Sequence, residues 1–284
     1  MKIVDTHAHI YSEDTRTYPL RKDPLLPPKG KGTLEHLKQE MGDNDVYRVV
    51  IVHTSTAYHW DNRLVGDVVP IAREFATGVC TLDPDDPKSP MLLEHYRERG
   101  LRGLRLYALG NPLTIESPGH VRLWEKCEQL GMVVCALINP PQLDALSRML
   151  RRFPKVPAVL DHCANLTADD APHSDNLKAA LAMAEHPKLH AKVTFLVTGS
   201  KENYPCKDTH ILGHKVIEAF GPDRCIWGSD FPCELWLQRK AGSTEPPKAT
   251  YAQHLRIFTH DLGLDQATKE AVLGKTALKL WFGE

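Results

Sequence analysis

The stretch Val49-Val50-Ile51-Val52 places four β-branched apolar residues in a row, with no polar residue between them. A strand with one face in water alternates apolar and polar residues. A strand of a parallel sheet is covered on both faces and reads as a continuous apolar run. Residues branched at Cβ also favour strands. The stretch therefore predicts a buried strand in a parallel sheet.

Similar segments alternate along the chain with segments in which apolar residues recur every three or four positions, as in helices. The predicted strands are 2–10, 46–54, 76–82, 101–107, 132–138, 157–162, 189–196 and 223–230; the predicted helices are 33–42, 61–75, 88–98, 118–130, 141–153, 173–186, 208–220, 250–262 and 265–281. Eight units in 284 residues correspond to about 35 residues each, the size of a βα repeat. The alternative, a doubly wound sheet, lacks its Gly-x-Gly-x-x-Gly loop after the first strand. We therefore expect an α/β fold, a (β/α)8 TIM barrel, as a single domain over 1–284.

The connections differ in length at the two ends of this predicted barrel. Links from helix to strand are short, whereas the links after the first, seventh and eighth strands are long, at 11–32, 197–207 and 231–249. In (β/α)8 barrels the loops at the carboxyl ends of the strands build the active site. The functional site is therefore expected at that end.

The overall composition excludes several classes of protein. The 35 Lys and Arg residues are balanced by 36 Asp and Glu residues, so the chain has no net positive charge that would attract nucleic acid or an anionic membrane. The longest apolar run, 132–138, is too short to cross a bilayer. The seven cysteines include no Cys-x-x-Cys pair, and no apolar leader follows Met1. These features predict a cytoplasmic protein with reduced thiols.

The strongest candidate for chemistry is the pair His7 and His9 in Asp5-Thr6-His7-Ala8-His9. Alternate residues of a strand point to the same side, so both imidazoles can hold one divalent ion or one substrate oxygen. The alternative is two partly buried histidines satisfied by hydrogen bonds. Asp230 ends the eighth strand before Pro232, and barrel closure brings that strand beside the first. Asp230 could instead cap a following turn.

Polar residues that end other strands can converge on the same mouth. His162, after the sixth strand, is a candidate proton shuttle or carbonyl polariser, or else a packed histidine. Arg105 on the fourth strand is a candidate clamp for a substrate carboxylate. Arg102 has the opposite parity, so only one of the two arginines faces inward, and either could instead form a surface ion pair.

Three further residues are candidates for substrate binding. Tyr107 ends the fourth strand, His53 follows the second strand, and Lys192 lies on the seventh. For His53 and Lys192 a structural role is an equally good interpretation.

Together these motifs resemble the amidohydrolase superfamily, and more narrowly its amidohydrolase-related group, which contains 2-pyrone-4,6-dicarboxylate lactonase and sugar lactonases. The resemblance is carried by His7-x-His9, Gly103-Leu-Arg105, Leu-Asp-His162, His-Ala-Lys192-Val-Thr and Phe220-Gly-Pro-Asp-Arg224-x-x-Trp227-Gly-Ser-Asp230-Phe-Pro. It implies that His7, His9 and Asp230 bind a metal or, in metal-free members, the substrate itself. It also implies that His162 and Arg105 face the substrate. The fifth strand has no histidine and the fourth no lysine, so a binuclear metal site is not expected.

Two histidines, one carboxylate and one open position are a sensible catalytic site for one divalent ion, zinc or manganese. Zinc lowers the pKa of bound water to about 7, and Asp230 is placed to take the proton. In the metal-free alternative Asp230 is the general base for a free water, while His7, His9 and His162 polarise the carbonyl.

The expected function is therefore hydrolysis of a lactone or related carboxylic ester by water attack. The expected partner is a small carboxylate-bearing lactone of the acidic or sugar-acid type. Two alternatives stay open: metal-dependent decarboxylation of an aromatic or enol acid, and a non-catalytic barrel that binds such an acid. The missing histidine on the fifth strand counts against decarboxylation.

Overall fold

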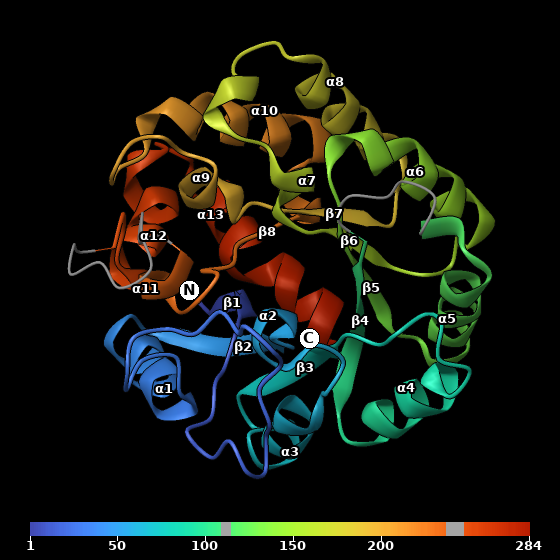
Figure 1. Ribbon diagram of the computed structural model, residues 1–284. Helices are drawn as coiled ribbons and strands as arrows, with labels where there is room; N and C mark the ends of the chain where they lie inside the picture. The colour runs from blue at the N-terminus through green and yellow to red at the C-terminus, as the bar shows by residue number, and fades with distance from the viewer. Residues whose placement is uncertain (109–114, 237–246) are drawn as a thin grey trace.

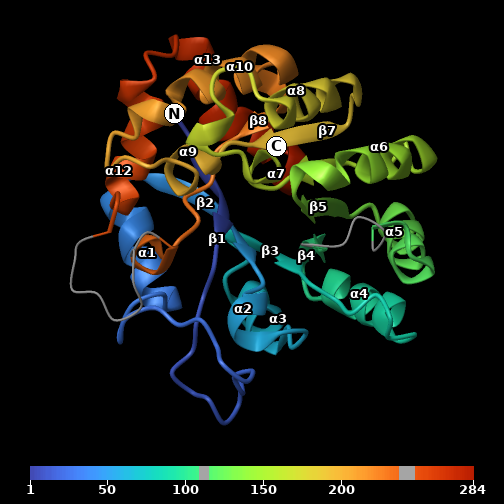
Figure 2. The ribbon, with the colours of Figure 1, turned by 45° about the horizontal axis from the view of Figure 1, so that its top comes forward.

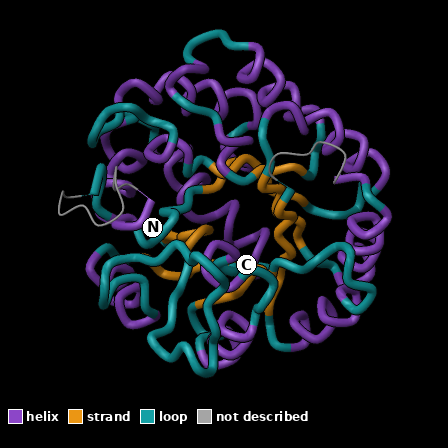
Figure 3. Tube along the Cα trace, in the orientation of Figure 1, coloured by secondary structure: helices purple, strands orange, loops and turns teal. Residues whose placement is uncertain are grey.

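The computed structural model describes residues 1–108, 115–236 and 247–284, and within them eight parallel strands form one sheet in the order β1 to β8. The strands make a central ring with the helices outside it (Figures 1 and 3). A parallel bridge between Ala8 and Phe231, and a hydrogen bond from the Thr6 N–H to the Trp227 carbonyl, join the segment that follows the last strand to the first strand. The predicted (β/α)8 barrel is confirmed. The strands are β1 (Ile3–Ala8), β2 (Val46–Val52), β3 (Ala76–Cys80), β4 (Leu101–Tyr107), β5 (Val133–Leu137), β6 (Ala158–Leu160), β7 (Leu189–Lys192) and β8 (Cys225–Ile226).

The predicted helices form the outer layer, with boundaries that differ by a few residues from those expected. They are α1 (Leu34–Asp43), α3 (Arg63–Ile71), α4 (Ser89–Glu98), α5 (Pro118–Leu130), α6 (Leu143–Arg152), α8 (Asp175–Ala182), α10 (His210–Phe220), α12 (Tyr251–Arg256) and α13 (Gln266–Glu270). The last two predicted helices are wrong as continuous α-helices, because α12 and α13 continue in π-helical turns. No helix within the described residues is long and apolar enough to cross a membrane.

Three predicted strands are at least twice as long as the observed ones. The segment 223–230 pairs only over Cys225–Ile226, 189–196 only over Leu189–Lys192, and 157–162 only over Ala158–Leu160. An apolar pattern in the sequence indicates that residues are buried. Residues stay buried beyond the last hydrogen bond between neighbouring strands, so the pattern overestimates the length of a strand. Short helices were therefore missed at the carboxyl ends of the strands, namely α2 (Ser55–Tyr58), α7 (His162–Asn165), α9 (Phe195–Thr198) and α11 (Cys233–Trp236).

The three long links lie at the carboxyl ends of the strands, as expected. The link 11–32 projects from the barrel between α1 and α2 (Figure 2), and α9 begins before 197–207. Of the link 231–249, residues 237–246 lie outside the described part of the chain.

An apolar plug fills the amino-terminal half of the barrel. Inward-facing strand residues pack there against Leu278 and Trp281 of the C-terminal segment, which crosses the centre of the ring in Figure 1. A Cβ added to Gly103 would lie 3.0 Å from the Trp281 ring, so this glycine allows the indole to reach the strands. The strand residues of the plug are Val4, Val50, Val52, Val79, Val133, Cys135, Val159 and Ile226.

We expect Gly274→Ala to destabilise the barrel by roughly 1–3 kcal/mol. A Cβ at this position would lie 1.9 Å from the backbone oxygen of Lys2, so the C-terminal segment must move away from β1. The matched control is Gly42→Ala in α1, where a Cβ meets nothing within 4 Å and helix propensity favours alanine. Urea unfolding measures both variants; equal stabilities would contradict the packing at Gly274.

Candidate active site

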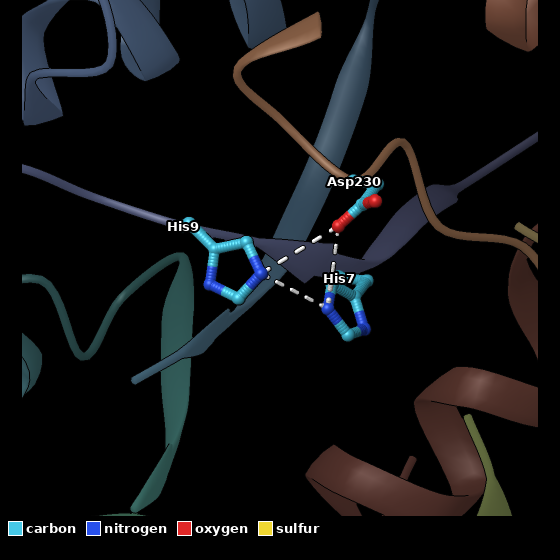
Figure 4. Close-up of side chains that lie close together, drawn as sticks. All are labelled: His7, His9 and Asp230. Atoms are coloured by element: carbon cyan, nitrogen blue, oxygen red, sulfur yellow. Dashed lines mark hydrogen bonds and ion pairs between the residues drawn. The ribbon is translucent and has the colours of Figure 1, made fainter. Parts of the chain in front are cut away.

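His7, His9 and Asp230 meet at the rim of the barrel. The Nε2 atoms of the two histidines are 3.2 Å apart, and each lies 3.5 Å from Oδ1 of Asp230 (Figure 4). The register of β1 against β2 shifts between Asp5 and Ala8. The Asp230 N–H donates to the backbone oxygen of His7 at 2.8 Å. The adjacency predicted from barrel closure is thus present in the structure.

A buried carboxylate that the sequence reading did not assign holds this arrangement. Asp5 accepts hydrogen bonds from the backbone N–H groups of His7 and Ser229, at 3.0 and 2.9 Å, and from the hydroxyls of Ser229 and Tyr251. The turn that carries Asp230 is therefore tied to β1. Asp230 itself has a φ of 56°, a left-handed conformation that aspartate tolerates better than most residues.

Beneath the histidines lies a buried row of charges. Asp161 receives Nε of Arg105 at 2.9 Å and lies 2.8 Å from Nζ of Lys192. Lys192 also contacts Nδ1 of His7 at 3.0 Å. Burial opposes the charge on Asp161, but Lys192 and Arg105 outweigh it and hold the pKa of the carboxyl well below its usual value. Asp161 went unassigned, although it directly precedes His162 in the sequence.

Arg105 is the arginine of β4 that faces inward, and Arg102 is exposed on the other side. The Nε–H group of the Arg105 guanidinium donates a hydrogen bond to Asp161. Its Nη2 lies 3.5 Å from both His7 and His162. Arg105 therefore offers only part of its donor set to a ligand.

His162 lies in the site, but it belongs to the short helical turn α7 that follows β6 and is not the last residue of the strand. Residues His162 to Asn165 all have left-handed φ values, between 47° and 58°, and such strain is often found at functional sites. Nδ1 of His162 meets the Thr194 hydroxyl at 2.5 Å. Burial lowers the pKa of His162 to about 4, with Arg105 and Lys192 adding to the effect, so the ring is neutral at neutral pH.

A cavity of about 250 Å³ opens above these residues. Five predicted residues line it: His9, Arg105, Tyr107, His162 and Asp230. The sequence reading missed its other lining residues because they lie on or next to the short helices or at the end of β5. They are Ser55, Thr56, Leu137, Asn165 and Thr198.

Two predicted substrate-binding residues do not line this cavity. His53 follows Val52, which faces inward, so His53 points outward. Its Nε2 contacts the backbone oxygen of His59 at 2.8 Å, and burial lowers its pKa to about 4. Lys192 is fully buried below the site. Neither side chain is among the described residues that line the cavity.

The donor set His7, His9 and Asp230 fits one small divalent ion. In a tetrahedral zinc site with ligand distances of about 2.0–2.1 Å, neighbouring ligand atoms lie about 3.3 Å apart, close to the 3.2 and 3.5 Å seen here. Nδ1 of His9 meets the Val52 carbonyl at 2.8 Å; it must donate there, which places the lone pair on Nε2. His7 can bind a metal through Nε2 when its proton lies on Nδ1, which faces the Asp161 carboxylate at 3.9 Å. Lys192 must then donate to Asp161, at 2.8 Å, and no longer to Nδ1 of His7.

Two curated relatives act on lactones. The chain is 27% identical over 241 residues to L-fucono-1,5-lactonase of Burkholderia ambifaria, covering 81% of this chain and 80% of the relative. It is 25% identical over 233 residues to 4-sulfomuconolactone hydrolase of Rhizobium radiobacter, covering 80% and 75%.

Solved structures share the fold, and a family model spans nearly the whole chain. A probable 2-pyrone-4,6-dicarboxylic acid hydrolase from Acinetobacter baumannii, with citric acid bound, superposes with a TM-score of 0.80 at 17% identity over 99% of both chains. A zinc-bound amidohydrolase from Burkholderia multivorans gives 0.77 at 18% identity, also over 99% of both chains. The family model for amidohydrolases matches residues 4–283. The chain therefore belongs to the amidohydrolase family.

Proposed function

We propose that this amidohydrolase is a lactonase, which opens a lactone or related carboxylic ester with water. The observation that carries the proposal is the Asp230 carboxylate at the floor of a small cavity, 3.5 Å from two imidazoles. A base next to electrophile-polarising groups is what ester hydrolysis requires. The activities of the two lactone-acting relatives point the same way.

Asp230 is proposed to act as the general base. As the water oxygen bonds to the lactone carbonyl carbon, its proton passes to the Asp230 carboxylate. The ring C–O bond then breaks, and protonated Asp230 returns the proton to the leaving alkoxide, so that the product is the open hydroxy acid. His162 and Nη2 of Arg105 face the same cavity and can donate to the developing oxyanion.

His7, His9 and Asp230 would hold the metal ion when one is bound. The ion would supply Lewis-acid polarisation and would lower the pKa of the attacking water. The chain's own part is to orient the ligands: the Val52 carbonyl orients His9, and the Asp161 carboxylate, paired with Lys192, faces Nδ1 of His7.

The cavity favours a polyhydroxylated lactone. Ser55, Thr56, Tyr107, Asn165 and Thr198 supply neutral hydroxyl and amide groups, and the Ser55 hydroxyl has no hydrogen-bond partner among the described residues. The cationic group of the lining is Arg105, which already binds Asp161. A sugar-acid lactone matches this lining better than a dicarboxylate does. We place the reaction in the cytoplasm, where the seven free cysteines stay reduced.

The proposal is tested by acid release from a panel of lactones, corrected for spontaneous hydrolysis. We expect turnover of sugar-acid 1,5-lactones, with weaker turnover of 2-pyrone-4,6-dicarboxylate. Carbon dioxide released from an aromatic acid, without lactone turnover, would replace this function with decarboxylation. Tight binding of an acid with no product by mass spectrometry would identify a binding barrel.

Protein purified without chelator is expected to contain about one zinc or manganese per chain by elemental analysis. His9→Ala removes a ligand with a preset lone pair, so the metal content should fall to background. The exposed His173→Ala is the control and should keep the metal. An active wild-type protein without metal would instead leave Asp230 and the histidines to act alone.

A further inference from the structure

A second, larger cavity lies at the opposite end of the barrel from the site described above. Its volume is about 770 Å³. It is bounded by residues near the amino-terminal ends of β2, β3 and β4 and by the C-terminal segment, whose end lies beside β3 in Figure 1. The apolar plug around Trp281 separates the two cavities.

The lining of this cavity is strongly cationic. It contains Arg48, Arg73, Arg99, Arg102 and Lys279, against the single acid Glu98. Arg48 is paired with Glu284, and Arg99 binds Asp67 at 2.7 Å.

Three of these cations have no acid within ion-pair distance in the part of the chain that the structure describes: Arg73, Arg102 and Lys279. Partial burial, with Arg97 nearby, holds the pKa of Arg102 below its ordinary value. Like charges gathered in one hollow repel one another, and a bound anion relieves that repulsion.

Two buried donors at the same cavity are also unsatisfied. Nε1 of Trp281 and Nε of Arg48 have no hydrogen-bond partner among the described residues, and Trp281 is 3% exposed. Buried donors in native proteins are nearly always paired, so an orphan calls for an explanation. The remaining wall is apolar, from Val69, Pro70 and Phe282.

We propose that this cavity binds a small organic anion that carries at least two phosphate or carboxylate groups. Guanidinium groups recognise both kinds of group through paired hydrogen bonds. The apolar wall and the indole N–H suit an organic body between the charged groups. The volume lies in the range of small-molecule sites, about 300–1,000 Å³. This ligand is distinct from the lactone, because the two cavities open at opposite ends of the barrel.

The test is isothermal titration calorimetry on the full chain with two probes, fructose 1,6-bisphosphate and citrate. We expect one site per chain for at least one probe, and the tighter probe tells phosphate from carboxylate recognition. In R73Q/R102Q the affinity should fall at least tenfold. The matched control is R122Q/R152Q, which removes two exposed arginines on α5 and α6 and should change the affinity less than twofold.

Lys279→Gln is a second variant that removes one cation without touching a strand, and it should weaken binding at least threefold. Thermal melts of all variants separate loss of binding from loss of folding. No binding of either probe to the wild type would overturn the proposal. So would equal affinity in R73Q/R102Q, which would place the anion in the Arg105 cavity. R73Q/R102Q could also differ from the wild type in molecular mass by light scattering while neither protein binds an anion. That result would assign the cationic cavity to a contact with a protein partner and would overturn the proposal.

Discussion

Asp230→Asn is expected to lower kcat/KM for lactone hydrolysis by about 10²–10⁴-fold, the usual contribution of a general base. The amide cannot take the proton from the attacking water, whereas the carboxylate that it replaces lies 3.5 Å from both His7 and His9. Asparagine also tolerates the left-handed φ of 56° at this position. The loss therefore comes from the missing carboxylate, as base and as metal ligand, and not from a strained backbone; steady-state kinetics on the best lactone of the panel measures it.

Asp223→Asn is the matched control. Asp223 is an exposed aspartate in the turn Pro222–Arg224, so the same chemical change there should leave kcat/KM within about twofold of the wild type. Circular dichroism checks that both variants are folded. Unchanged turnover in Asp230→Asn would remove Asp230 from the mechanism.

Asp161→Asn is expected to destabilise the protein by about 3–5 kcal/mol, the cost of breaking a buried ion pair from one side. Asp161 is fully buried between Arg105 and Lys192, at 2.9 and 2.8 Å. Without its charge, two cations remain in the barrel, and among the described residues Asp230 is the nearby carboxylate that can offset Arg105. Urea unfolding at neutral pH measures the loss.

The control for this change is Glu185→Gln, which breaks the exposed ion pair with Arg151 at 3.3 Å and should cost under about 1 kcal/mol. The double variant Asp161→Asn/Lys192→Met should recover part of the lost stability, because it also removes one unpaired cation. A loss below 1 kcal/mol in Asp161→Asn would contradict the central role of this carboxylate.

The sequence was sufficient to predict the barrel and the meeting of His7, His9 and Asp230. Both follow from topology: eight βα units close a ring, and closure places the end of the eighth strand beside the first. Neither conclusion needed an accurate strand boundary. The prediction of this site therefore holds even though β8 has two paired residues instead of the eight predicted.

The direction in which a side chain points, and how deep it lies in the barrel, were harder to predict from the sequence than the topology. His53 was a candidate for the site, with a structural role as an equally good interpretation, because a one-residue change in alternation moves a side chain to the other face of a strand. The left-handed turn at His162–Asn165 has no signature in its sequence, because none of its four residues is glycine. The pairing of Asp161 with Lys192 depends on how deep two inward side chains lie in a closed barrel, which periodicity does not report.

The apolar plug at Trp281 also affects the kinetics. With the amino-terminal half of the barrel filled, substrate and product both use the cavity that the described residues form at the carboxyl ends of the strands. The hydroxy acid must depart before the next lactone arrives, so the two compete for the same free enzyme. Accumulating product would then act as a competitive inhibitor, and progress curves would bend well before the lactone is exhausted.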